Sequence, residues 1–258
     1  MKSLWNSFKI AFSMFSKIPM PQAEWTKENM KYMFCFFPFI GLVTGAVFTA
    51  VALAGTALGL DGVFRTALLV MIPVLITGGI HVDGLLDTAD ALSSWREKER
   101  RLEILKDSHA GAFAVIIGIS YFVLAFGTAS MVSAECLPVL CLIFALARTY
   151  SALSVENFPK ANPSGTAAAF GGNSLKKRVN AVMAVYLVLL CGGAVLLNPL
   201  HGVLMAAAAA LTFWYYHHMA MKYFGGMTGD LAGFFVSVCE LVMTLAVIIG
   251  NRIAGMIG

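Results

Sequence analysis

The sequence predicts an all-α, polytopic integral membrane protein built as a helix bundle. Three observations support this fold class. Hydrophobic residues make up 59% of the 258 positions, and charged residues make up only 12%, about half the fraction found in soluble domains. The apolar residues also form continuous runs of the length that a membrane-spanning helix needs. A β-barrel does not fit, because its strands alternate apolar and polar residues.

Seven apolar runs are candidates for membrane spans. They cover about residues 33–59, 64–82, 111–132, 136–155, 179–197, 200–219 and 231–250. Before them, large apolar residues recur at helical spacing between lysines. This pattern predicts an amphipathic helix at the membrane interface, ending at Pro19 and Pro21; a first membrane span is the alternative. No repeat or separate soluble domain is evident, so residues 1–258 are interpreted as a single membrane-embedded domain.

Cysteine usage and net charge narrow the function classes. The five cysteines all fall in or beside apolar runs and form no CxxC motif, so they are interpreted as packing residues rather than disulfides or a zinc site. The net charge of +4 is modest and gives no indication of nucleic-acid binding.

Basic residues are distributed asymmetrically between the two sides of the predicted bundle. If the N-terminus is cytoplasmic, the cytoplasmic segments hold fifteen of the eighteen basic residues: Lys2, Lys9, Lys17, Lys27, Lys31, Arg96, Lys98, Arg100, Arg101, Lys106, Lys160, Lys176, Lys177, Arg178 and Lys222. The positive-inside rule therefore predicts this orientation. It also places the carboxylates of Asp83, Asp87, Asp90, Asp107 and Asp230 near the cytoplasmic face.

A first motif of acidic residues continues directly from the second apolar run. Asp83, Asp87 and Asp90 have the spacing i, i+4, i+7, which places them on one helix face. Carboxylates at membrane depth are costly and are functional candidates by default. Three anions on one stripe repel one another unless a cation lies between them, and hard cations such as Mg²⁺ prefer carboxylate oxygens. The stripe therefore predicts a metal site and phosphate chemistry.

Residues beside these acids are candidates for substrate contact. Gly79 and Gly84 would let the backbone approach a bulky ligand. His81 is a candidate phosphate contact or general base, or else a hydrogen-bonding residue of the helix interior.

A second motif at residues 103–111 precedes the third apolar run. Lys106 is a candidate phosphate contact, and Asp107 could join the metal shell or orient Lys106. Ser108 is a candidate substrate contact. Asp107 or Ser108 could instead cap the helix that starts near Gly111.

A third motif, at residues 225–230, leads into the last apolar run. Its glycines, including Gly229, would bring backbone N–H groups near an anion, and Asp230 is a candidate metal ligand from a second helix. Glu240 lies about 15 Å deeper along a helix, so we expect it to pair with Arg148 inside the bundle; accepting a substrate proton or amide is the alternative. The polar loop at 157–166 is either a lid over the site or an ordinary connection.

These motifs, in this order along the chain, resemble the cobalamin synthase family, the adenosylcobinamide-GDP ribazoletransferases. The resemblance rests on Gly79-Ile80-His81-Val82-Asp83-Gly84-Leu85-Leu86-Asp87-Thr88-Ala89-Asp90, Ile104-Leu105-Lys106-Asp107-Ser108-His109-Ala110-Gly111, Thr228-Gly229-Asp230, Phe15-Ser16-Lys17-Ile18-Pro19-Met20-Pro21 and Phe37-Pro38-Phe39-Ile40-Gly41. The first two motifs together are the specific ones.

The resemblance implies a Mg²⁺-dependent phosphotransfer. A ribose hydroxyl of α-ribazole or its 5′-phosphate attacks adenosylcobinamide-GDP, and GMP leaves as adenosylcobalamin or its phosphate forms. The implied metal ligands are Asp83, Asp87, Asp90 and Asp230. The implied catalytic residues are His81, Lys106 and Asp107. The implied location is the cytoplasmic (inner) membrane, in contact with lipid. A homo-oligomer or an association with other cobalamin-pathway enzymes is possible.

Two other function classes remain open at this point. One is another membrane phosphotransferase or prenyltransferase with a nucleotide- or diphosphate-activated donor, although the D-x3-D-x2-D spacing differs from their usual patterns. The other is an ion-coupled transporter, whose acidic residues should lie near the membrane midplane on broken helices.

Overall fold

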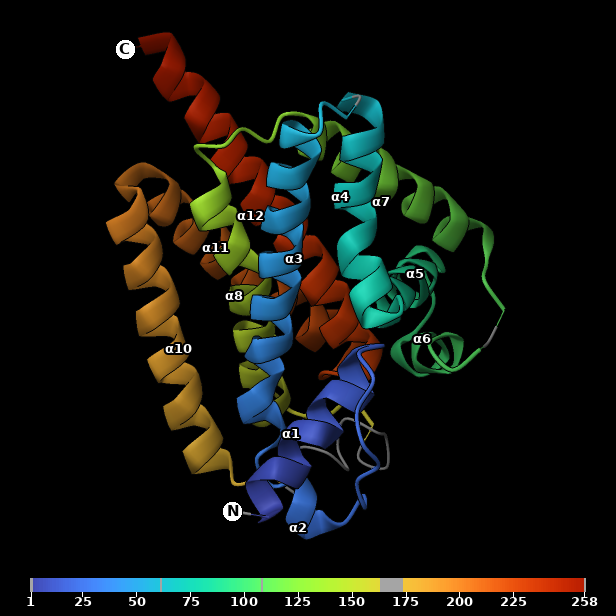
Figure 1. Cartoon of the computed structure of the whole chain (residues 1–258). Helices are drawn as coiled ribbons and strands as arrows, with labels where there is room; N and C mark the ends of the chain where they lie inside the picture. Colours follow the sequence, from blue (N-terminus) through green and yellow to red (C-terminus); the bar gives the residue numbers. More distant parts are fainter. Residues whose placement is uncertain (1, 61, 108, 163–173, 258) are drawn as a thin grey trace.

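The computed structural model describes residues 2–60, 62–107, 109–162 and 174–257, and its main regular elements are helices (Figure 1). They are α1 (Lys2–Phe15), α2 (Lys27–Met30), a 3-10 turn (Met33–Phe36), α3 (Phe37–Ala57), α4 (Gly62–Thr77), α5 (Ile80–Ser93), α6 (Lys98–Ile104), α7 (Ala112–Ser130), α8 (Leu137–Asn157), α10 (Lys176–Leu197), α11 (Pro199–Phe224) and α12 (Gly229–Ile257). The predicted all-α class is confirmed.

The structure gives fewer candidate membrane spans than the seven apolar runs, so the count of seven is not confirmed. In the described residues, five segments are long and apolar enough to cross a bilayer: Lys27–Ala57, α7, α8, α10 and Gly229–Met256. A sixth span results if α4 and α5 are counted as one bent span. The run at 200–219 lies in α11, where His201, Trp214, Tyr215 and Tyr216 reduce the apolar character.

The second apolar run is broken by two glycines. Gly78 and Gly79 both have positive φ, 67° and 81°, a conformation that L-residues other than glycine rarely adopt. The helix axis turns by 93° between α4 and α5. The acidic stripe therefore does not continue along the axis of α4 but lies on α5, which packs against α7 and α12.

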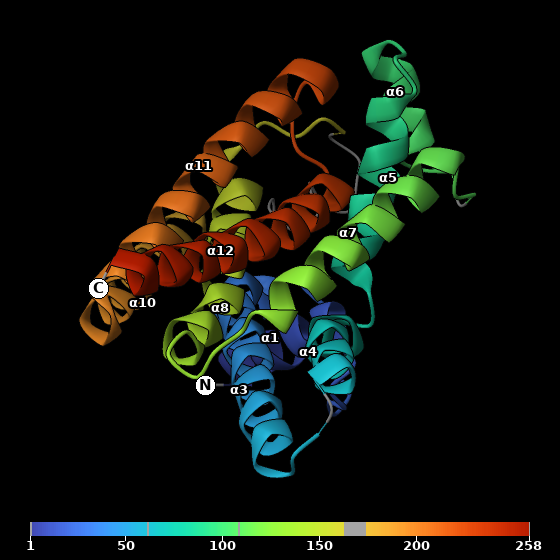
Figure 2. The same ribbon diagram turned by 90° about the horizontal axis from the view of Figure 1, so that it is seen from above.

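The centre of the bundle is α8, most of which is buried inside the protein. It packs against α3, α10 and α12. Gly41 on α3 allows the backbones of α3 and α8 to touch, since a Cβ there would lie 2.4 Å from the carbonyl oxygen of Phe144. Viewed from above, α12 lies between α11 and the pair formed by α5 and α7 (Figure 2).

The predicted N-terminal amphipathic helix is present as α1, which ends at Phe15 before Pro19. Its 14 residues span about 21 Å, which is too short for a membrane span. Its buried residues Ile10, Ala11 and Phe12 pack in a common cluster with the start of α3. The helix thus forms one wall of the protein at the N-terminal end.

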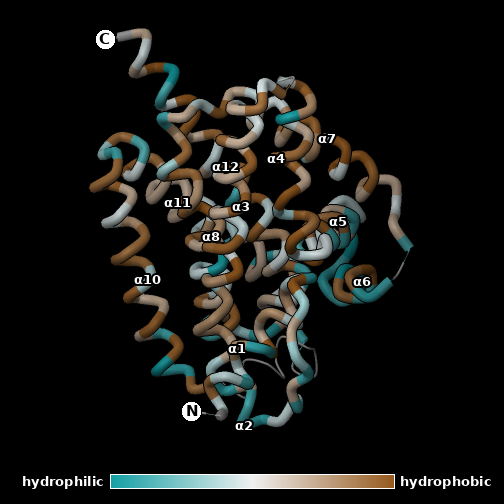
Figure 3. The backbone as a smooth tube through the Cα atoms, viewed as in Figure 1, coloured by the Kyte–Doolittle hydropathy of each residue, from teal (hydrophilic) through white to brown (hydrophobic). Residues whose placement is uncertain are grey.

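The chain termini lie at opposite ends of the bundle (Figure 1). The connection from α3 to α4 and the turn from α10 to α11 lie at the end with the C-terminus. Hydrophilic residues gather on α5 and α6 and around α1 and α2, whereas the long helices are largely hydrophobic (Figure 3).

Candidate active site

A cavity of about 560 Å³ with both apolar and charged lining residues, here called the main cavity, lies where α5, α12 and the segment after α6 meet. Five of the predicted site residues line it: His81, Asp83, Lys106, Gly229 and Asp230. They come from all three motifs, the third of which follows the other two by more than a hundred residues of chain. The fold therefore brings the three motifs to one place.

A close crossing of α5 and α12 places Asp83 beside Asp230. Gly84 is buried, and a Cβ at its position would lie 2.5 Å from the carbonyl oxygen of Asp230. The approach at Gly233 is looser, since a Cβ there would lie 3.3 Å from the Cα atom of His81. The sequence predicts that Gly84 lets the backbone approach a ligand. In the structure, the group that approaches Gly84 is the backbone of α12.

The four predicted metal ligands form one acidic cluster. The carboxylates of Asp83, Asp230 and Asp90 all lie close enough to Asp87 to repel its charge. Within the described part of the chain, none of the four is paired with a basic side chain. The cluster thus has the uncompensated negative charge that the sequence predicts.

The acidic cluster is not a complete metal cage. Among the described residues, no three His, Cys, Asp or Glu side chains are arranged to hold a metal ion by themselves. Asp83 and Asp230 both face the main cavity, whereas Asp87 lies beside them and is only partly exposed.

Asp90 makes contacts that set it apart from the other three acidic residues. Its Oδ2 accepts a hydrogen bond from the backbone N–H of Gly111 at 2.5 Å, and its Oδ1 accepts one from Ala114 at 2.8 Å. These are the N–H groups at the start of α7, which have no partner within that helix. Asp90 therefore caps α7 from a neighbouring helix and fixes α5 against it. Its predicted role as a metal ligand stays a prediction.

The second motif divides between the cavity and solvent. Lys106 lines the main cavity. Asp107 is exposed and accepts hydrogen bonds from the ring Nδ1 of His109 at 2.8 Å and from its backbone N–H at 3.0 Å. These bonds lower the pKa of Asp107 below its usual value. Asp107 does not line the cavity, and Ser108 lies outside the described residues.

His81 is buried, with 8% of its surface exposed, and lines the main cavity. Its ring lies 5.9 Å from that of Phe37, measured between centroids. Its Nε2 atom has no hydrogen-bond partner among the described residues. A buried ring nitrogen in this state is costly, so a ligand atom in the cavity is a natural partner for it.

The predicted pair between Arg148 and Glu240 is confirmed. Arg148 is fully buried, and its Nη1 lies 2.6 Å from Oε1 of Glu240. The same nitrogen donates to the carbonyl oxygen of Phe144 at 2.8 Å. The pair joins α8 to α12, and neither residue lines the main cavity.

Several lining residues were not singled out from the sequence. The described start of the 157–166 loop is paired with the α11–α12 connection: Met227 donates to Pro159 at 2.8 Å, and Ala161 donates to Met227 at 3.0 Å. Asn162 and Thr228 then line the cavity. Thr228 belongs to the third motif. The hydrogen bonds between the two loops could not be predicted, because contacts between distant loops produce no regular residue spacing in the sequence. The part of the loop from 163 on lies outside the described residues.

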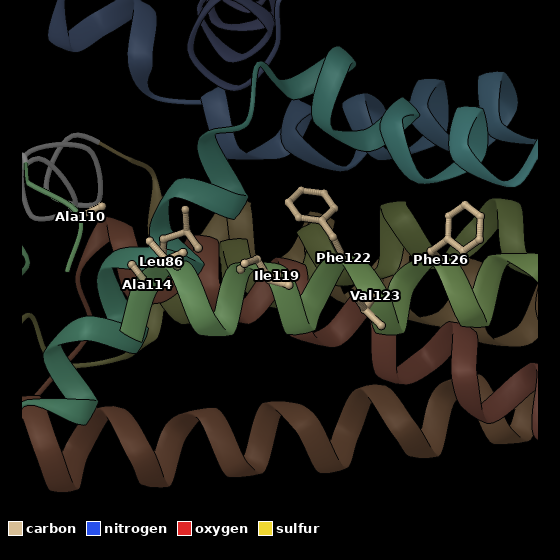
Figure 4. A pocket seen from close by; sticks show the side chains of 9 residues that line it. Leu86, Ala110, Ala114, Ile119, Phe122, Val123 and Phe126 are labelled. Atoms are coloured by element: carbon tan, nitrogen blue, oxygen red, sulfur yellow. The ribbon is translucent and has the colours of Figure 1, made fainter. Parts of the chain in front are cut away.

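A separate pocket on α7 is apolar. It is lined by Leu86 and by α7 residues that include Phe122 and Phe126 (Figure 4). The pocket offers no charged side chain, so it does not take part in phosphate chemistry.

The fold and the cavity together define a class of protein: a multi-pass helical membrane protein with an acidic site that one basic side chain and one histidine also line. Residues 7–248 match the family model described as cobalamin-5-phosphate synthase. The chain belongs to this family, which confirms the resemblance seen in its motifs.

Curated relatives cover nearly the whole chain. It is 45% identical over 248 residues to the adenosylcobinamide-GDP ribazoletransferase of Lachnoclostridium phytofermentans, covering 96% of this chain and 95% of the relative. Proteins of the same name from Clostridium botulinum strains Eklund 17B and Alaska E43 are 38% and 34% identical over 245 residues, covering 94% of this chain and 96% of each relative. No solved structure matches the chain.

Proposed function

We propose that this chain is an adenosylcobinamide-GDP ribazoletransferase that acts in the last steps of cobalamin synthesis. The observation that carries the proposal is the convergence of Asp83, Asp230, His81 and Lys106 on one cavity. These residues come from the motifs that define the family resemblance. The near-full-length similarity to relatives of that name supports the same activity.

The acidic residues fit Mg²⁺ as the cofactor. Mg²⁺ prefers oxygen ligands and is usually bound by one or two carboxylates together with substrate phosphates, rather than by a complete protein cage. The facing pair of Asp83 and Asp230, with Asp87 beside it, offers such an incomplete set. When bound, Mg²⁺ would neutralise negative charge that develops on the diphosphate.

The remaining residues have roles that follow from their positions. Lys106 would bind a phosphate oxygen of the donor. An acceptor ribose oxygen bonds to the phosphorus on the cobinamide side, and the bond from that phosphorus to the bridging oxygen breaks. GMP leaves with the bridging oxygen, and the hydroxyl proton passes to Nε2 of His81. Catalysis is then mainly positioning and charge neutralisation.

The cavity volume limits what can enter it. About 560 Å³ suits a drug-sized molecule but not a whole corrinoid with its nucleotide. We infer that the diphosphate enters the main cavity and that the corrinoid lies outside it, along the membrane surface. Since most of the basic residues lie in segments predicted to be cytoplasmic, the positive-inside rule supports a site facing the cytoplasm of the inner membrane.

The direct test uses the purified full chain in detergent with adenosylcobinamide-GDP, α-ribazole or its 5′-phosphate, and Mg²⁺. We expect GMP and the corresponding cobalamin in equal amounts, with no GMP when EDTA is present. Release of CMP or pyrophosphate from other donors, without GMP from this one, would instead identify a different transferase. Ion flux in vesicles without any phosphotransfer would identify a transporter.

A further inference from the structure

A second cavity, here called the side cavity, adjoins the main cavity. Its volume is about 570 Å³, and it lies between the end of α1, the end of α4 and the start of α5. The two cavities share Met14, Ile80 and Asp83. Their other lining residues come mostly from different elements, so the cavities extend in different directions from Asp83.

The side cavity has one basic side chain, that of Lys17. Its backbone N–H donates to the carbonyl oxygen of Ile76 at 2.7 Å, which fixes the segment after α1 to the end of α4. Its side chain lies across Gly78, where a Cβ would overlap it. No acidic side chain in the described residues forms an ion pair with Lys17. The charged groups that line this cavity are thus Lys17 and Asp83.

We propose that the side cavity binds the acceptor substrate and that Lys17 binds a phosphate monoester on it. This inference rests on the proposed function and adds to it the position of the acceptor and the residue that selects its phosphorylated form.

The geometry of phosphoryl transfer assigns one cavity to each substrate. In phosphoryl transfer, the attacking and leaving oxygens lie roughly in line on either side of phosphorus. Two cavities that meet at Asp83 provide one space for the diphosphate donor and another for the nucleophile. The main cavity has the acidic pair and Lys106, as a diphosphate with Mg²⁺ requires. The side cavity remains for the acceptor.

The polar groups of the side cavity suit a single phosphate. One lysine, with the exposed Ser13 beside it, matches one phosphate monoester better than a diphosphate. A volume of about 570 Å³ also suits a nucleoside-sized molecule. A lysine contacts phosphate as a point charge, so an arginine at this position should retain part of the effect.

The test compares two acceptors, α-ribazole 5′-phosphate and α-ribazole, with the donor at a fixed saturating concentration in detergent. The quantity measured is the ratio of their kcat/KM values for GMP release. We expect Lys17→Gln to lower this ratio about tenfold or more, because a charge-assisted contact to the 5′-phosphate is lost. Lys17→Arg should retain most of it. Lys177→Gln, which removes an exposed charge from α10, should leave the ratio unchanged.

The outcomes separate this inference from the proposed function. If the unmodified protein releases no GMP with either acceptor, the proposed function is wrong. If it does, and Lys17→Gln lowers kcat/KM equally for both acceptors, Lys17 serves the donor or the fold, and the inference is overturned. A ratio that does not change in Lys17→Gln overturns it as well. If Lys17→Gln weakens only the interaction with vesicles of anionic lipid and leaves the kcat/KM ratio unchanged, Lys17 contacts lipid headgroups instead, and the inference is overturned.

Discussion

Asp83 is the charged residue among the three that line both cavities. We expect Asp83→Asn to abolish GMP release, because the amide keeps the shape of the side chain but removes the negative charge that Mg²⁺ needs. Since Asp83 is exposed and has no ion pair within the described residues, the melting temperature in detergent should hardly change. Glu99→Gln is the matched control, because Glu99 is exposed on α6 and does not line the cavity. An active Asp83→Asn protein would remove this residue from the metal site.

Asp87 and Asp90 should differ in their contribution to the stability of the metal-free protein. Asp87 is repelled by the three acidic residues around it, so Asp87→Asn should leave stability equal or higher while lowering activity. Asp90 caps α7, so Asp90→Ala should cost about 1–3 kcal/mol. Thermal unfolding in EDTA measures both. Equal losses of stability in the two variants would contradict this division of roles.

The acidic residues of the site could be predicted from the sequence, but their separate roles could not. Negative charge in an apolar context is itself a signal, so Asp83 and Asp230 were found directly. The partners of Asp90 are backbone N–H groups more than twenty residues away, and any helix start would look the same in sequence. Lys17 counts in the sequence as one of the basic residues of the cytoplasmic side and as part of a segment that resembles the family, but its spacing does not mark it as a substrate contact.

The crossing of α5 over α12 depends on one glycine. A Cβ at residue 84 would lie 2.5 Å from the backbone of Asp230, and backbone cannot move aside as a side chain does. We expect Gly84→Ala to cost about 1–3 kcal/mol of stability and to lower activity by separating Asp83 from Asp230.

Gly127→Ala on α7 is the control for this substitution. Nothing lies within 4 Å of a Cβ at Gly127, so the change should alter stability by no more than about 1 kcal/mol. Melting temperatures in detergent and GMP release are measured for both variants. If Gly84→Ala is as stable and active as Gly127→Ala, the close crossing does not position the site.

The bend between α4 and α5 shows where the prediction of elements failed. The apolar run at 64–82 passes through Gly78 and Gly79 without a change in hydrophobicity, so hydrophobicity alone gave one continuous span. The two glycines were visible, but glycine is also tolerated within membrane helices. The turn places α5 against α12 and α7.

The helix bundle has two ends that carry different parts of the chain. The N-terminus and α2 lie at one end, and the α3–α4 connection and the C-terminus lie at the other (Figure 1). The class of the fold and the approximate limits of most helices followed from the sequence, because long apolar runs have few alternatives in a membrane. The number of spans did not follow, because polar and aromatic residues lower the hydropathy of α11 and because the α4–α5 pair is bent by 93°.

The orientation of these two ends in the membrane can be tested with single cysteines. Glu99 on α6 and Glu135 between α7 and α8 are both exposed. The positive-inside rule places the α6 end in the cytoplasm. We therefore expect a membrane-impermeant maleimide to label Glu135→Cys in intact cells and to label Glu99→Cys only after lysis.

The unmodified chain, which has five cysteines of its own, gives the background labelling. Both variants should retain GMP release, since neither residue lines the main cavity. Labelling of Glu99→Cys in intact cells would place the acidic site outside the cell. The donor and the acceptor would then have to reach the site from the external side, and the proposed cytoplasmic synthesis would not be possible.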